Sequence, residues 1–344
     1  MTLPQWRPLD EPWARDLTPH YGTETGGTPS SASVTQFLSY AAAFLVCPAP
    51  PLPFAASQKP CGATPVVDLI SMSYDIDQLE IRMYEHSRFV DVFLIVESTV
   101  THRGAPKPLF FPKFRHRFKA LEDRIVFAVH HGTEHHVEGA PETIRPEDWR
   151  NEDLPRQFGF GALEKLQLPR PFVVLFGDTD EIWATPPPCT PPSSGLCPET
   201  LFKYKNTVSR SPEVVVGGRS GQTPVVFTYP APKLPFHSCR DHVRGSVGYH
   251  IGSFLSPVAW LVKEISVAES WGIARRHGDP RARIANPYLI YDTALNRGAA
   301  PCCPVPRNQR PRKSTDRIPL ALQRFGRDRY PYLMGSNASC NHYA

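Results

Sequence analysis

Three acidic residues follow a short apolar run near the middle of the chain: Asp178, Asp180 and Glu181. Residues 173–176 (Val-Val-Leu-Phe) come after Pro171 and are too few for a helix, so they predict a buried strand. The i, i+2 spacing of the two aspartates directs both side chains to one face of an extended segment. Two carboxylates on one face repel each other unless a cation lies between them. A hard divalent ion held by these carboxylates and by substrate phosphates would meet that need.

A plain turn is the alternative for the same residues. Aspartates after a strand commonly bond their own backbone and close a turn. The preceding apolar strand supplies the context of a ligand site, because open α/β sheets bind ligands outside the carboxyl ends of their strands. From the spacing alone, the turn and the metal site both stay open.

The segments around these acids predict an α/β fold. Apolar runs bounded by turn-forming residues predict strands over 66–70, 90–97, 125–129 and 173–176. One helix is expected to begin with Asp75 as N-cap and Gln78 in a capping box, and another to lie within 151–167. Strands that alternate with helices imply a mainly parallel sheet. The acids then lie at the exit of the fourth strand.

Further elements are expected after a proline-rich loop that follows residue 183. They are strands at 213–216 and 225–229, a strand or loop at 248–254, and helices at 257–268 and 320–325. Ser256 suits the cap of the first of these helices, and Pro257 suits its first turn.

Composition divides the chain into an ordered domain and two irregular ends. The 344 residues are 41% hydrophobic, as in globular proteins, but 39 prolines exceed the usual share of about 5%. We expect residues 1–64 to be a poorly ordered Pro/Ser/Thr-rich segment, 65–298 to be the ordered domain and 299–344 to be a Pro/Arg-rich tail. The apolar stretch 37–47 is shorter than the roughly 20 residues of a membrane span and lies too far in for a signal peptide. It predicts a packed helix, with an incomplete N-terminus as the alternative, and no membrane anchor is visible.

The net charge and the cysteine pattern further limit the class of protein and the partners that the sequence allows. A net charge of +5 is modest, and the basic residues do not form the clustered stripe that nucleic-acid binding needs, so we expect no nucleic-acid partner. The basic stretch 307–329 is expected to be a solvated tail. Eight cysteines contain no CxxC pair, so a standard zinc site is unsupported. Cys189 and Cys197 could close a disulfide in a secretory compartment, and Asn337 begins a single glycosylation sequon.

Five motifs in order along the chain resemble glycosyltransferase family 17. They are VVDLI (66–70), LEIR (79–82), VDVFLIVEST (90–99), GAPKPL (104–109) and DTDEI (178–182). The similarity covers roughly residues 65–298, which the resemblance makes a GT-A-like catalytic domain. It implies a β-1,4-N-acetylglucosaminyltransferase that takes UDP-GlcNAc as donor and a mannose of an N-glycan, on a glycoprotein or oligosaccharide, as acceptor. It also implies that Asp178 and Asp180 hold Mn²⁺ or Mg²⁺ on the diphosphate of the donor.

The resemblance nominates five further site residues. Because the donor is α-linked and the product β-linked, direct displacement needs a general base, for which Glu181 is the neighbouring candidate. His250 matches a histidine of the family and is a second catalytic candidate, and Lys263 matches a lysine in the following helix. Glu97 and Lys107 are expected to meet the nucleotide, with a turn acid and a solvated lysine as their plain alternatives.

Other features weigh against a simple transfer of function. Both cysteines of the family stretch around His250 are replaced, by Ile251 and Phe254, which leaves a non-catalytic carbohydrate-binding relative as the alternative. A haloacid-dehalogenase-like phosphatase is a further alternative, because it also places Asp-x-Asp after a strand. The family implies the Golgi or another secretory compartment. Glu80 and Arg82 lie two apart on a helix and are expected to form structural ion pairs with strand residues.

The doubled histidines at 130–131 and 135–136 could suggest a separate metal site, but no acid or cysteine is clearly paired with them, so a solvated loop is the favoured interpretation.

Overall fold

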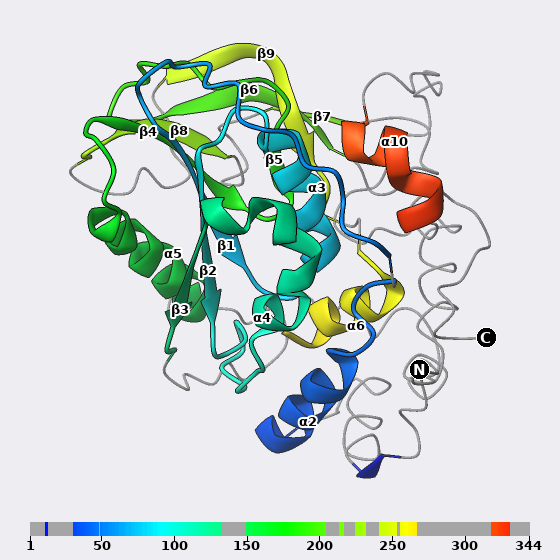
Figure 1. Ribbon diagram of the computed structural model, residues 1–344. Coiled ribbons are helices and arrows are strands. Elements are labelled where there is room, and N and C mark those ends of the chain that lie inside the picture. The colour runs from blue at the N-terminus through cyan, green and yellow to red at the C-terminus, as the bar shows by residue number, and fades with distance from the viewer. Residues whose placement is uncertain are drawn as a thin grey trace.

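The computed structural model describes residues 11–12, 30–47, 49–132, 149–203, 213–216, 224–231, 241–252, 255–266 and 318–330. Within these residues one nine-stranded sheet forms the centre of the molecule (Figure 1). Its strands are β1 (Val66–Met72), β2 (Val92–Ser98), β3 (Ile125–His130), β4 (Phe172–Asp178), β5 (Glu181–Trp183), β6 (Leu196–Lys203), β7 (Glu213–Val216), β8 (Val225–Tyr229) and β9 (Asp241–His250). The strands expected from the apolar runs are therefore confirmed.

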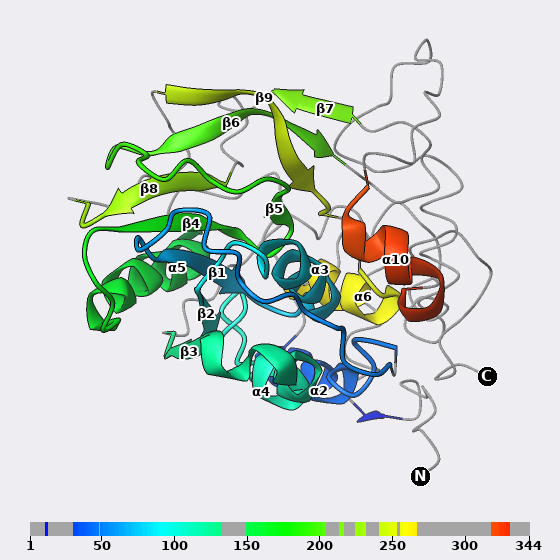
Figure 2. The same ribbon diagram turned by 45° about the horizontal axis from the view of Figure 1, so that its top comes forward.

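The sheet has a parallel part and a mixed part. Its order is β3-β2-β1-β4-β8-β6-β9-β5, with β7 paired to β6. The first four strands are parallel. Beyond β4 the sheet continues through antiparallel β8, and β6 pairs in parallel with β9 (Figure 2). The α/β class is confirmed, and the parallel sheet inferred from the alternation is the part made by β1 to β4.

Helices pack on both faces of this sheet. They are α2 (Ser31–Ala41), α3 (Ile76–His86), α4 (Phe110–Phe114), α5 (Arg150–Ala162), α6 (Pro257–Ser266) and α10 (Leu320–Arg329), with 3₁₀ segments η2 (Arg115–Arg124) and η5 (Leu163–Lys165). One face of β1, β2 and β4 shares a buried core with α2, α3, α4 and α6. The opposite face packs under α5. Burial on both faces explains why these strands are apolar throughout.

The register brings the carboxyl ends of the parallel strands together. Ser71 of β1 lies opposite Asp178 of β4, and Met72 lies opposite Glu97 of β2. The acidic turn after β4 therefore lies at the same sheet edge as the end of β2. This edge is where a parallel α/β sheet places its ligands.

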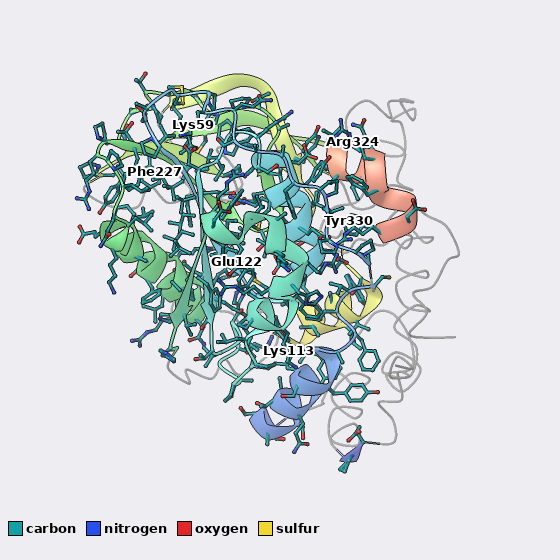
Figure 3. The ribbon with its side chains drawn as sticks, in the orientation of Figure 1. Lys59, Lys113, Glu122, Phe227, Arg324 and Tyr330 are labelled. Atoms are coloured by element: carbon teal, nitrogen blue, oxygen red, sulfur yellow. A yellow bond between two sulfur atoms is a disulfide. The ribbon has the colours of Figure 1, made fainter. Side chains whose placement is uncertain are left out.

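Both segments expected to be irregular contain parts that pack against the core. In α2, Phe37 and Leu38 are fully buried, so this part of the first 64 residues packs against the core. The packed helix expected in the apolar stretch is confirmed, although α2 begins earlier and ends at Ala41. The predicted C-terminal helix is confirmed as α10. At its end, the Tyr330 hydroxyl donates to Glu80 of α3 at 2.6 Å. Tyr330 lies between the two helices (Figure 3). The described part of the expected tail is thus docked rather than solvated.

The helix caps follow the sequence in one case and depart from it in the other. Ser256 Oγ accepts a hydrogen bond from Ala259 N at 3.1 Å, which confirms it as the cap of α6. The capping box of α3 is wrong: Asp75 precedes the helix, but its side chain makes no cap bond to the helix. Gln78 instead donates its side-chain amide to the Ile251 carbonyl at 2.7 Å, so it makes a tertiary contact rather than a local cap.

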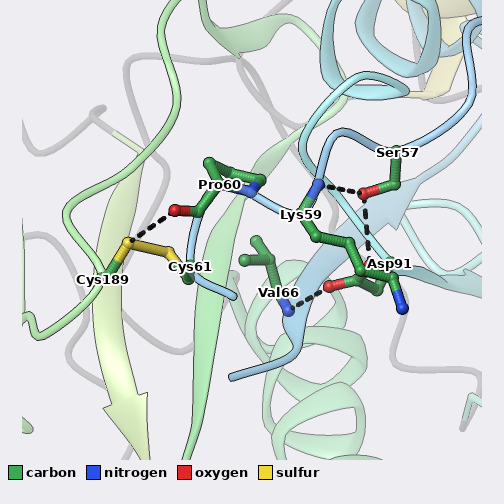
Figure 4. Close-up of a disulfide and its surroundings, with 7 residues drawn as sticks. All are labelled: Ser57, Lys59, Pro60, Cys61, Val66, Asp91 and Cys189. Carbon is green, nitrogen blue, oxygen red and sulfur yellow. Dashed lines mark hydrogen bonds between the residues drawn. A yellow bond between two sulfur atoms is a disulfide. The ribbon is translucent and has the colours of Figure 1, made fainter. Parts of the chain in front are cut away.

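A disulfide joins the segment before β1 to the loop after β5 (Figure 4). It links Cys61 with Cys189, whose Cα atoms are 5.2 Å apart, so the expected pairing of Cys189 with Cys197 is wrong. Beside it, the Asp91 carboxylate accepts from Val66 N at 2.9 Å and from Ser57 Oγ at 3.2 Å. The bond and this carboxylate together fix the entry into β1. No helix in the described part of the chain has the length and apolar character needed to cross a membrane.

Removing the disulfide is expected to destabilise the domain. The bond spans 128 residues of sequence, and closing so long a loop restricts the unfolded chain. Cys61→Ser combined with Cys189→Ser should lower the free energy of unfolding by about 2–4 kcal/mol, measured by urea unfolding under oxidising conditions. Ser57→Ala, next to the bond, is the control and should cost less. An unchanged urea midpoint in the double variant would contradict the prediction.

Candidate functional site

The turn between β4 and β5 is held by its main chain. Arg82 Nη1 donates to the carbonyl oxygens of Asp178, at 2.5 Å, and Glu181, at 2.7 Å. Thr179 Oγ1 donates to the Ser71 carbonyl at 3.0 Å. These bonds come from α3 and β1, which are themselves buried in the core. The turn is therefore held in place by buried residues of α3 and β1, and the side chains of its acids contact other groups.

The first acid of the turn binds an arginine from α5. Arg156 Nη2 lies 2.5 Å from Asp178 Oδ2, and its Nε lies 3.2 Å from Oδ1, so the contact is bidentate. Arg156 also pairs with Glu152 at 2.7 Å, one turn earlier on the helix. The Asp178 side chain remains 36% exposed. Sequence reasoning missed Arg156, because nothing near residue 156 in the chain indicates its partner.

The second acid lies beside a histidine and a lysine. His250 Nε2 is 3.2 Å from Asp180 Oδ2. Burial alone would raise the pKa of Asp180, but the His250 and Lys263 charges outweigh it and hold that pKa well below its usual range. Lys263 Nζ also donates to the Gly252 carbonyl at 3.2 Å. The structure therefore brings together three of the predicted site residues.

The third acid is turned inward. Glu181 begins β5 opposite His250 of β9, and only 4% of its surface is exposed. Its Oε2 accepts from the Asp178 backbone N–H at 2.9 Å. Burial, together with the charges of Asp178 and Asp180, raises the pKa of Glu181 to about 8. A general base must be deprotonated and within reach of the substrate, and the burial of this carboxyl favours neither condition.

A fourth carboxyl completes the acidic group, and sequence reasoning had assigned it only to a helix cap. Asp75 bonds the backbone N–H groups of Ser73 and Tyr74, at 3.1 and 3.0 Å. Burial and the charge of Asp180 raise its pKa, while a hydrogen bond with Thr179 lowers it. Asp75, which lies between β1 and α3, is therefore close enough to the turn for the charge of Asp180 to affect its pKa.

The donor chemistry of this group suits a hard cation that is only partly held by protein. Asp75, Asp178, Asp180 and Glu181 supply carboxylate oxygens. Burial raises the pKa values of Asp75 and Glu181, and repulsion from the neighbouring carboxylates, which a divalent ion would relieve, adds to it. Among the described residues, no three His, Cys, Asp or Glu side chains are arranged to hold a metal ion alone. An ion here would take its remaining ligands from substrate phosphates and water.

Glu97 and Lys107 bind each other rather than facing this group. Lys107 Nζ lies 2.7 Å from Glu97 Oε1, and the backbone N–H groups of Phe110 and Phe111 donate to the same carboxylate at 2.7 and 3.0 Å. Glu97 is fully buried, so it caps the first turn of α4 and cannot touch a nucleotide. The Lys107 ammonium forms this ion pair and also makes a cation–π contact with the ring of Phe110. Their expected nucleotide contacts are corrected to a structural role.

The other charged residues singled out from the sequence also lie in structural pairs. Arg82 binds Asp68 of β1 at 2.6 Å, which confirms the expected pair with a strand residue. Glu80 pairs instead with arginines outside the sheet, Arg117 at 2.5 Å and Arg329. His130 ends β3, 3.4 Å from Ser98 Oγ.

Two of the weaker sequence features, the histidines 135–136 and the sequon at 337, lie outside the described residues.

The sheet order and the acidic turn at the carboxyl end of β4 define a GT-A-like α/β fold. Residues 56–187, from before β1 to just after the turn, match the family model of glycosyltransferase family 17, which confirms the resemblance seen in the sequence. His250 and Lys263 lie beyond the matched region.

Two curated relatives match part of the chain. Each is named beta-1,4-mannosyl-glycoprotein 4-beta-N-acetylglucosaminyltransferase, one from Homo sapiens and one from Rattus norvegicus, and each is 27% identical over 123 residues. The alignment covers 34% of this chain and 21% of either relative. The chain therefore matches about a fifth of the length of these relatives.

Proposed function

We propose that this protein is a glycosyltransferase that transfers N-acetylglucosamine from UDP-GlcNAc to a β-linked mannose of an N-glycan, with inversion. The observation that carries the proposal is the turn from Asp178 to Glu181, which lies near the end of the family-matched region and meets His250 and Lys263. The names of the human and rat relatives support the sugar and the linkage. Its partners are then a nucleotide-sugar donor and a glycoprotein or oligosaccharide acceptor.

Mn²⁺ or Mg²⁺ is the proposed cofactor, held by Asp178 and Asp180. The Asp178 side chain is 36% exposed, and Asp180 stays ionised because of its neighbours His250 and Lys263. When bound, such an ion would stabilise the negative charge that develops on the departing diphosphate. Arg156 holds the Asp178 carboxylate in one orientation, which limits the rearrangement that binding requires.

Lys263 and His250 are proposed to act on the substrate side of Asp180. Lys263 is a compact ammonium held by the Gly252 carbonyl, and it suits a phosphate oxygen of the donor. His250 contacts Asp180 and stands opposite Glu181 in the β5–β9 pairing, so it lies beside any group that Asp180 binds. Of the two catalytic candidates, His250 is the less buried, at 9% exposed against 4% for Glu181.

Glu181→Gln separates a base from a structural acid. A glutamine oxygen can accept the Asp178 backbone N–H as the carboxyl does, so the variant should keep the transfer rate within about tenfold of the unsubstituted protein. A general base would lose about 10²–10⁴-fold when replaced. Initial rates at saturating donor measure the difference. A loss of about 10²–10⁴-fold in the Glu181→Gln variant would identify Glu181 as the general base. The rate of His250→Asn, measured in the same way, provides the matched comparison.

A secretory compartment, the Golgi in particular, is the proposed location. The Cys61–Cys189 bond supports it, because disulfides persist in oxidising environments and are rare in the cytosol. For the proposed transfer to occur, the N-glycan acceptor would have to reach the same secretory compartment as the protein. Imaging of the tagged full chain together with a Golgi marker tests the location, and a cytosolic distribution would contradict it.

The function is tested with the purified full chain. UDP-GlcNAc and a panel of N-glycans and simple mannosides are supplied with and without Mn²⁺, and UDP release is measured for the protein and for Asp180→Asn. Metal-dependent release that Asp180→Asn loses supports the proposal. Donor binding without release under any condition would establish the non-catalytic carbohydrate-binding alternative. Phosphate release from a phosphomonoester would establish the phosphatase alternative.

A further inference from the structure

One face of α3 carries three buried polar residues at a spacing of four: Gln78, Arg82 and His86. This spacing places them one above another along the helix. Each of the three side chains bonds a main-chain group of the candidate site. We name these three residues the polar stripe of α3.

The stripe contacts both chain segments of the site. Arg82 donates to the carbonyls of Asp178 and Glu181 in the turn, and the Trp183 backbone N–H donates to His86 Nε2 at 3.0 Å. At the other end, Gln78 Nε2 donates to the Ile251 carbonyl at 2.7 Å, directly after His250. The acidic turn and the end of β9 are therefore tied to the same rigid helix.

A single carboxylate orients the stripe. Asp68 of β1 accepts from Arg82 Nη2 at 2.6 Å and Nε at 3.1 Å, and from His86 Nδ1 at 2.6 Å. Because Nδ1 of His86 faces this carboxylate and Nε2 accepts from Trp183, the imidazole carries its proton on Nδ1. Asp68, Arg82 and His86 are all fully buried, so none of them can touch a substrate.

We infer that the polar stripe of α3 is a positioning device for the glycosyl-transfer site: Arg82 sets the turn that bears Asp178 and Asp180, and Gln78 sets His250. This inference rests on the proposed function. Residues that orient metal-binding groups are worth about 10–100-fold in metal affinity. A misplacement of about 1 Å between reacting groups costs about 100-fold in rate. The two ends of the stripe should therefore affect different measurements.

The test compares two stripe variants with a matched control. Arg82→Lys keeps the charge beside Asp68, but one ammonium cannot reproduce the fork that also reaches two carbonyls. Gln78→Met keeps the length and removes the donor to Ile251. Arg117→Lys is the control, because Arg117 is also buried and binds the Glu80 carboxylate bidentately. Among the described residues, no hydrogen bond or ion pair joins Arg117 to the turn.

Binding is measured apart from turnover, by the loss of the free Mn²⁺ signal in electron paramagnetic resonance as protein is added with UDP. Arg82→Lys should weaken Mn²⁺ binding about tenfold or more, whereas Arg117→Lys should leave it within threefold even though its melting temperature falls. Gln78→Met should leave Mn²⁺ binding within threefold and lower kcat about tenfold or more, with little change in donor KM.

The outcomes separate the two levels of the proposal. Arg82→Lys and Arg117→Lys with equal Mn²⁺ binding would overturn the positioning role while the transferase survives. If Arg82→Lys does not fold, Gln78→Met decides, and an unchanged kcat overturns the inference. An unsubstituted protein that releases no UDP with any acceptor overturns the proposed function, and the positioning role falls with it.

Discussion

Asp180→Asn is expected to lower the rate of N-acetylglucosamine transfer by about 10²–10³-fold, the loss typical of removing one preorganised electrostatic group. Asparagine keeps the shape of the side chain but has no charge to offer a metal ion. It also leaves His250, 3.2 Å away, and Lys263 without the carboxylate that both face. UDP release at saturating donor and Mn²⁺ measures the loss.

Glu122→Gln is the matched control for this prediction. Glu122 is an exposed acid that pairs with Arg115 on the surface of η2, so the same change there should not alter the rate. Thermal unfolding of both variants shows whether a lost rate reflects lost fold. A folded Asp180→Asn protein that keeps more than a third of the rate would remove Asp180 from the metal site and with it the mechanism proposed above.

The parallel half of the sheet could be predicted because its signals are local. Residues 173–176 are apolar on both faces, and β4 is buried on both faces between α5 and the larger core. The apolar stretch 37–47 also predicted the packed helix α2, although not its start. The docking of α10 gave no such signal, because the Arg329 contact with Glu80 spans 249 residues of sequence. Contacts of that separation depend on tertiary packing rather than on the neighbouring residues.

The residues of the candidate site also differ in how well the sequence predicted them. The acidic turn was visible from its spacing, and His250 and Lys263 were visible only through the family resemblance. Arg156 carried no signal, because the choice of Asp178 as its partner is made by the packing of α5 on the sheet. The Gln78 side chain is bound by its amide donor to the Ile251 carbonyl, 173 residues away, because leaving that buried carbonyl unsatisfied is costly, and a contact of this separation gives no signal near residue 78.

The disulfide shows a different limit. Eight cysteines allow about a hundred connectivities, so sequence spacing could not choose Cys61 for Cys189. The expected pair, Cys189 with Cys197, relied on closeness along the chain. The observed pair is close only in the folded protein, where the segment before β1 meets the loop after β5. A pairing of this kind follows from the fold and cannot precede it.

Asp68→Ala is expected to be the most destabilising of the substitutions considered, at about 3–5 kcal/mol in the free energy of unfolding. Asp68 is fully buried and is the counter-charge of Arg82, which is equally buried. Its removal would leave a guanidinium inside the core without the carboxylate that neutralises it. The His86 imidazole would lose its acceptor at the same time. Urea unfolding at pH 7 measures the cost, with Glu122→Gln again as the control that should leave stability almost unchanged.

The pH dependence tests the cause of that loss. Burial alone would raise the pKa of Asp68, but Arg82 and His86 overcome it and lower the pKa from 3.8 to about 2. Because the folded pKa lies below the unfolded value, the stabilisation is fully present above about pH 4 and is lost as the pH falls through 2. The stability gap between the protein and Asp68→Ala should therefore narrow on acidification through this window. A gap that stays constant from pH 7 to pH 2 would show that Asp68 acts by packing rather than by charge.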